Sequence, residues 1–105
     1  METLKFRHTT RGPAAGMIRS ALVGVVGSGN LEVLLERTLQ ATECTVEIVT
    51  PVRGYDEVWE AVIADFVERA SPGGLRISIN DGGARPDTVM LRLLQGARTM
   101  EVGND

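Results

Sequence analysis

The chain of 105 residues is poor in the groups that enzymes most often use for chemistry. It has one cysteine and one histidine, so an internal disulfide is impossible and a zinc site of several thiols or imidazoles cannot be assembled. A single thiol also fits a reducing compartment, and we therefore expect a cytoplasmic protein. The chain therefore has few side chains suited to nucleophilic or metal chemistry.

Basic residues are outnumbered by acidic ones and form no cluster in the sequence. Eleven lysines and arginines face 14 acidic residues, which gives a formal net charge of -3. Affinity for nucleic acid comes largely from neutralising phosphates, and binding to anionic membrane surfaces needs a basic cluster. No apolar run approaches the length that spans a bilayer, and no cationic segment leads into an apolar one at the start. We expect a soluble protein that binds neither nucleic acid nor membrane.

What the chain does contain is sufficient for one folded domain. Hydrophobic residues make up 43% of it and charged residues 24%, which is a globular composition. A domain of this length buries roughly two-thirds of the surface of its unfolded chain, enough for one core. We therefore predict a single domain over residues 1–105.

The pattern of apolar residues predicts strands, then a helix, a strand and a second helix. Alternation predicts a short edge strand around Leu4 and Phe6 and further strands over residues 18–26, 31–36, 45–49 and 75–80. Helical spacing follows Asp56, a candidate N-cap, and Pro86, a good first-turn residue. Residues 9–17 are predicted to form a loop and residues 103–105 a frayed tail. This order predicts an α+β fold, with a mostly antiparallel sheet covered on one face by two amphipathic helices.

The segment Val25-Val26-Gly27-Ser28-Gly29-Asn30 is the most informative part of the chain. It lies between two predicted strands, and glycine and asparagine tolerate positive φ, so a hairpin turn over residues 27–30 is predicted. An ordinary turn would explain this segment without any function. An ordinary turn needs fewer glycines, however, and each glycine costs roughly 0.5–1 kcal/mol relative to alanine in regular structure. An uncrowded Ser28 hydroxyl between Gly27 and Gly29 suits the covalent attachment of a large group.

Two other roles for Ser28 fit the sequence less well. A catalytic nucleophile needs a base within hydrogen-bond reach, and the single histidine, His8, lies in the predicted edge strand. A phosphate-binding loop would contain a lysine and lead into a helix, whereas this segment leads into a strand. Gly82-Gly83, ahead of the second helix, is a weaker candidate for contacting an anion, and a plain strand-to-helix loop is the favoured interpretation.

The remaining candidates favour structural roles. Cys44, at the start of a strand, is interpreted as a small buried hydrophobe. Trp59 and Tyr55 are interpreted as core or rim residues of the first helix, with partner binding as the alternative. A solvated helix face is predicted for the acidic residues Asp56, Glu57, Glu60, Asp65 and Glu68. These residues together predict a carrier or other non-catalytic subunit without a metal, rather than an independent enzyme.

Residues 23–36 closely resemble the acyl carrier (delta) subunits of bacterial malonate decarboxylase. Residues 1–4, 79–86 and 91–96 are similar to the same family, so the resemblance covers nearly the whole chain. The chain resembles the gamma (acyl carrier) subunit of citrate lyase more distantly. The chain departs from the family pattern at Asn30, where aspartate is common.

The resemblance implies a specific chemistry. Ser28, flanked by Gly27 and Gly29, would carry 2'-(5''-phosphoribosyl)-3'-dephospho-coenzyme A through a phosphodiester. The thiol of this group would hold acetyl and malonyl thioesters during transfer and decarboxylation. Carrier transferase and decarboxylase subunits would perform these steps, and a dedicated transferase would attach the prosthetic group. Two alternatives stay open: a citrate lyase-type acyl carrier, and a non-covalent interaction or regulatory subunit that never carries a group.

Overall fold

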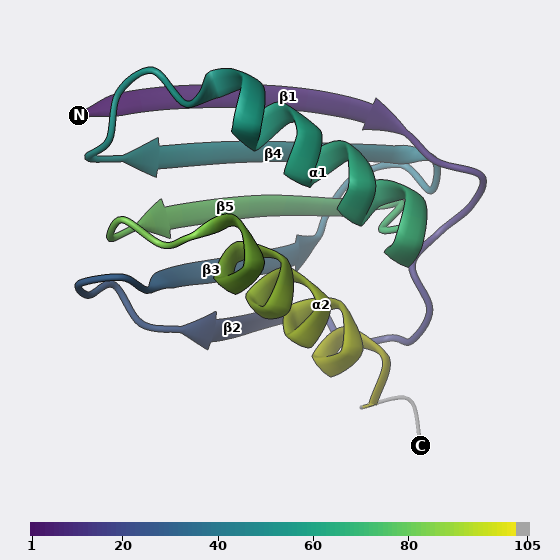
Figure 1. Ribbon diagram of the computed structural model, residues 1–105. Coiled ribbons are helices and arrows are strands. Elements are labelled where there is room, and N and C mark those ends of the chain that lie inside the picture. Colours follow the sequence, from purple (N-terminus) through teal and green to yellow (C-terminus); the bar gives the residue numbers. More distant parts are fainter. Residues whose placement is uncertain (103–105) are drawn as a thin grey trace.

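A computed structural model describes residues 1–102 and shows one sheet with two helices on the same face (Figure 1). In chain order the elements are β1 (Glu2–Thr9), β2 (Ser20–Gly24), β3 (Leu31–Arg37), β4 (Glu43–Thr50), α1 (Asp56–Ala70), β5 (Leu75–Asp81) and α2 (Pro86–Val102). The strand order across the sheet is β1-β4-β5-β3-β2. The predicted α+β fold is confirmed, and the tail predicted to fray lies outside the described residues.

The sheet is mixed, because one pair of neighbouring strands is parallel. β1 pairs with β4, β2 with β3 and β3 with β5, all antiparallel. β4 and β5 run parallel, with Ile48 opposite Ile79. Parallel neighbours need a crossover connection, which α1 supplies. The carboxyl ends of β4 and β5 therefore lie at one end of the sheet, and Figure 1 shows the β2–β3 connection at that same end.

Apolar and polar side chains alternate along the strands as predicted, so the apolar side chains share the sheet face that the helices cover. In β5, Leu75, Ile77 and Ile79 are at most 2% exposed. Burying such a side chain contributes roughly 1.5–3 kcal/mol relative to leaving it in water. The helices bury the side chains of Trp59, Ile63, Phe66, Val89, Leu93 and Met100 in the same core. Each helix thus turns an apolar face towards the sheet, which confirms the prediction of two amphipathic helices on one face.

Most strand boundaries differ from the prediction by one or two residues; for example, β2 begins at Ser20 and β4 at Glu43. β1 is not short: its eight residues all pair with β4, so Thr9 belongs to the strand and not to the loop predicted over residues 9–17. The strand predicted over residues 18–26 ends earlier, at Gly24. Gly24 has a φ of 76°, and a Cβ there would lie 2.1 Å from the carbonyl oxygen of Leu31. This left-handed conformation turns the chain out of the strand.

The start of α1 also differs. Asp56 is not the N-cap; Tyr55 occupies that position without a side-chain capping bond, and Asp56 is the first helical residue. There its charge favours the positive end of the helix dipole. The other predicted helix signals hold. α1 stops before Ser71, which adopts a left-handed φ of 47°, and α2 begins at Pro86.

Candidate functional site

Ser28 lies at the tip of the connection between β2 and β3. The amide of Asn30 donates a hydrogen bond to the carbonyl oxygen of Gly27 at 2.9 Å, which closes a turn over residues 27–30 (the serine turn). Gly29 has a φ of 73°, as the third residue of a type II turn requires. Ser28 is the second residue of this turn and is exposed. The predicted turn is therefore present, and it presents Ser28 to the surroundings.

The two glycines beside Ser28 have different roles. Gly29 is required by its positive φ, whereas Gly27 has no positive φ. A Cβ added at either position would meet no atom within 4 Å. The backbone and its packing therefore give no reason for glycine at position 27. The open space on both sides of Ser28 fits a bulky substituent on its oxygen.

Gly82, in the loop between β5 and α2, holds the serine turn in place. Its amide donates to the carbonyl oxygen of Asn30 at 2.8 Å, and the amide of Gly29 donates to the carbonyl oxygen of Gly82 at 3.1 Å. A Cβ on Gly82 would lie 2.0 Å from the carbonyl oxygen of Gly27, so only glycine fits beneath the turn. The sequence suggested a plain loop or an anion contact at Gly82. Its role in the structure is close packing under Ser28.

A cationic side chain reaches the serine turn from α2. Arg92 donates from Nε to Asn30 Oδ1 at 3.2 Å, and the same oxygen accepts a bond from the amide of Leu31 at 2.8 Å. Arg92 Nη1 donates to Gln95 Oε1 at 3.1 Å, which leaves Nη2 outside these two bonds. An aspartate at position 30 could accept the same bonds. Asparagine and aspartate at position 30 are therefore both compatible with the contact to Arg92.

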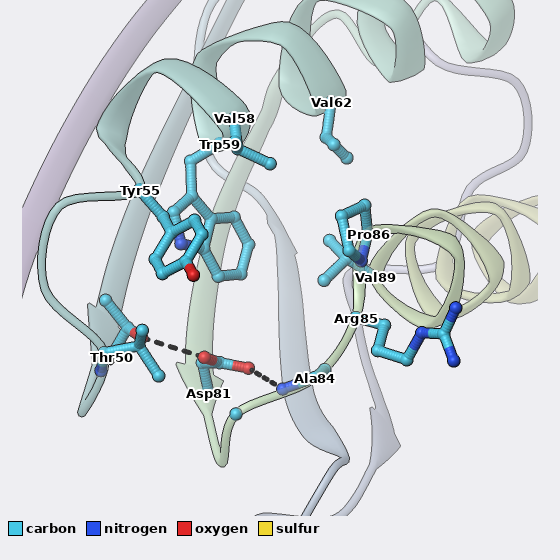
Figure 2. Close-up of a pocket in the computed structure, with 12 residues that line it drawn as sticks. Thr50, Tyr55, Val58, Trp59, Val62, Asp81, Ala84, Arg85, Pro86 and Val89 are labelled. Carbon is cyan, nitrogen blue, oxygen red and sulfur yellow. Dashed lines mark hydrogen bonds between the residues drawn. The ribbon is translucent and has the colours of Figure 1, made fainter.

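A cavity of about 380 Å³ opens at the carboxyl ends of β4 and β5 (Figure 2). Thr50 and Asp81 form its buried polar side. Thr50 Oγ1 donates to Asp81 Oδ2 at 2.8 Å, and the amide of Ala84 donates to Asp81 Oδ1 at 2.9 Å. These bonds fix the same β5–α2 loop that supports the serine turn. Most of the other lining is apolar: Val52, Tyr55, Val58, Trp59, Val62, Pro86 and Val89. The sequence did not predict this cavity.

His8 is far from the serine turn. β1, which carries His8, and β2, which precedes the turn, are the two opposite edges of the sheet. His8 is also near the end of β1 that points away from the serine turn in Figure 1. Hence the single imidazole of the chain cannot act as a base for Ser28 within this subunit.

The other candidates have structural surroundings. Cys44 is fully buried, and burial raises the pKa of its thiol to about 12, so it stays protonated at neutral pH. Trp59 is 6% exposed and Tyr55 52% exposed, which places them in the core and at the rim as predicted. The acidic residues of α1 form an exposed face. Within residues 1–102 no three acidic, histidine or cysteine residues gather as metal ligands, and neither helix is long and apolar enough to cross a membrane.

The different roles of the two glycines predict different effects of alanine. We expect Gly29→Ala to lower the free energy of unfolding by about 1 kcal/mol, because alanine is strained at positive φ. Gly27→Ala should change it by less than about 0.5 kcal/mol, since the added methyl group meets nothing. Urea unfolding of the two variants beside the unsubstituted chain measures this difference. Equal losses would mean that Gly27 also has a structural role.

Comparisons with known proteins agree with one another. The family model described as malonate decarboxylase delta subunit (MdcD) matches residues 18–100. The malonate decarboxylase acyl carrier protein of Bradyrhizobium diazoefficiens is 63% identical over 100 residues, covering 95% of each chain. The protein of the same name from Xanthomonas campestris pv. campestris is 50% identical over 101 residues, covering 96% of each.

A solved structure is similar over almost the same length. It is a chain of the crystal structure of a Pseudomonas malonate decarboxylase hetero-tetramer in complex with malonate. That chain superposes with a TM-score of 0.83 at 40% identity, covering 95% of this chain and 99% of its own. Family model, relatives and fold therefore all give the same assignment: the chain belongs to the family of malonate decarboxylase acyl carrier (delta) subunits.

Proposed function

We propose that this chain is a non-catalytic acyl carrier subunit of a malonate decarboxylase. In this proposal Ser28 carries 2'-(5''-phosphoribosyl)-3'-dephospho-coenzyme A through a phosphodiester. The observation that carries the proposal is the exposed Ser28 on a turn fixed by Gly82, with open space at Gly27 that the fold does not need. Curated relatives named as acyl carrier proteins of malonate decarboxylase support the assignment.

The residues around Ser28 fit a phosphodiester. The Ser28 oxygen would form the bond to phosphorus as a leaving group departs from an activated donor of the group, and Gly27 and Gly29 leave room for the ribosyl phosphate. The guanidinium of Arg92 lies next to the serine turn, through its bond to Asn30. A cation at this place favours an attached anionic phosphate. Since His8 lies at the other edge of the sheet, the base for attachment must come from the prosthetic-group transferase.

The chain supplies attachment and presentation, while partners supply catalysis. When bound, the group provides a thiol on which acetyl and malonyl groups are held as thioesters. Decarboxylation needs hydrogen-bond donors aimed at the thioester oxygen, which we assign to the decarboxylase subunit. Attachment at the exposed Ser28 would let the carrier transferase and the decarboxylase reach the group at high effective concentration. The similar Pseudomonas chain comes from a hetero-tetramer, which supports such partners.

Intact-mass spectrometry tests the proposal. The chain would be co-expressed with the other subunits and the prosthetic-group transferase, purified, and mapped by peptide digestion. We expect a mass increase equal to the phosphoribosyl-dephospho-coenzyme A group, located on Ser28. An unmodified chain in a complex that still decarboxylates malonate would contradict it and leave an interaction subunit as the better account. Assays with malonate and citrate separate this system from a citrate lyase-type carrier.

A further inference from the structure

The cavity at the carboxyl ends of β4 and β5 is next to the serine turn. Gly82, which exchanges two backbone hydrogen bonds with the serine turn, is followed directly by Gly83, and Gly83 lines the cavity. One hydrogen bond and one residue step put Gly29 and the cavity rim within roughly 10 Å of each other. A group attached to Ser28 that contains an entire dephospho-coenzyme A spans this separation.

The cavity has the size and character of a site for a small, mostly apolar moiety. Its volume of about 380 Å³ lies within the range of ligand pockets. Figure 2 shows Tyr55, Val58 and Trp59 on one side and Pro86 and Val89 on the other. Tyr55 and Val58 are exposed at 52% and 41%, although both are apolar enough to gain from being covered. Something that packs against this rim would remove apolar surface from water.

The charged residues of the cavity lining favour a neutral occupant over an anionic one. Asp81 is 5% exposed, and each of its carboxylate oxygens accepts one hydrogen bond, from Thr50 and Ala84. Arg85 is the one basic residue in the lining, and Figure 2 shows its guanidinium directed away from Tyr55 and Trp59. Arg85 Nε lies 3.8 Å from Asp87 Oδ1, outside the cavity lining. A second negative charge inside would be unpaired and repelled, whereas a neutral group would not.

We propose that this cavity shelters the acetyl thioester end of the group on Ser28 and excludes the malonyl thioester. The inference rests on the proposed function. The acetyl thioester is neutral and small, and inside the cavity it is protected from water and other nucleophiles between reaction cycles. The malonyl thioester ends in a carboxylate that Asp81 repels. It therefore stays outside, where a partner subunit can reach it.

The single tryptophan of the chain, Trp59, lines the cavity and reports on it without any activity assay. The loaded chain would be prepared in thiol, acetyl and malonyl forms, each verified by intact mass. We expect acetylation to shift the Trp59 emission and to reduce quenching by acrylamide. The malonyl form should match the thiol form. The rate at which hydroxylamine consumes the acetyl thioester is the second readout.

Substitutions that fill the cavity should remove both effects. In Val62→Phe, and in the rim variant Val58→Phe, hydroxylamine should consume the acetyl thioester about tenfold faster than in the unsubstituted chain. This corresponds to a loss of about 1.4 kcal/mol in the free energy that protects the thioester. Val58 is exposed, so its variant keeps the test valid if Val62→Phe unfolds. Leu91→Phe is the matched control, since Leu91 is 61% exposed and does not line the cavity.

The outcomes separate this inference from the proposed function. A chain that never gains the group overturns both. A loaded chain with identical Trp59 signals in all three forms, and with equal hydroxylamine rates in the unsubstituted and Val58→Phe proteins, overturns the shelter alone. An apolar side chain of a partner subunit would then be the better candidate to bind in the cavity. Ser28 would still be the attachment site.

Discussion

Replacing Ser28 with alanine should abolish malonate decarboxylation by the assembled complex while leaving the subunit folded. The substitution removes the only oxygen to which we assign the prosthetic group, so no thioester can be carried. Ser28 is exposed at the second position of its turn, a position compatible with most residues. We therefore expect the free energy of unfolding to change by less than about 0.5 kcal/mol. Decarboxylation assays, intact mass and urea unfolding of the same preparation measure the three quantities.

Two further variants make this result specific. Ser20→Ala, in exposed edge strand β2, is the matched control and should retain loading and activity. Ser28→Thr keeps the hydroxyl, but the added methyl group crowds its oxygen, so loading should be slower but not lost. If Ser28→Ala retained full activity, the attachment would be elsewhere or absent. A non-covalent interaction or regulatory subunit would then be the better interpretation.

The serine turn was predictable because its signals are local. Glycine at position 29 indicates a positive φ, and the polar break between two apolar runs predicts the hairpin. Its support was not predictable in the same way. Gly82 lies 52 positions beyond Asn30 in the chain, and no periodicity reveals that its amide donates a hydrogen bond to the carbonyl oxygen of Asn30. Likewise, Arg92 occurs in an amphipathic pattern that predicts a helix but not the contact with Asn30.

The cavity was missed for a topological reason. The strand–helix–strand order over residues 43–81 contained the signal, because a helix between two neighbouring strands is the usual crossover of a parallel pair. Ligands commonly bind beyond the carboxyl ends of parallel strands. The prediction of a mostly antiparallel sheet is correct for the other pairings. It did not identify β4 and β5 as a parallel pair. The position of the cavity beside Ser28 depends on β4 and β5 being neighbours.

Gly82→Ala should give the second large effect, and it acts on folding and loading together. The new methyl group would lie 2.0 Å from the carbonyl oxygen of Gly27 and 3.0 Å from that of Asn30. Relief requires the serine turn to move away from the β5–α2 loop, which weakens both backbone hydrogen bonds between Gly82 and the turn. Overpacking of this kind costs roughly 1–3 kcal/mol, and the two weakened bonds place our expectation at the upper end of that range.

Gly83→Ala is the control that separates steric displacement from backbone strain. Gly83 has a φ of 91°, and a Cβ there meets no atom within 4 Å, so alanine should cost about 1 kcal/mol of strain without moving the serine turn. Urea unfolding and the rate of prosthetic-group attachment are the measurements. We expect slow attachment for Gly82→Ala and unchanged attachment for Gly83→Ala. Equal attachment in both variants would show that the transferase recognises Ser28 whatever the position of its turn, and that Gly82 serves stability alone.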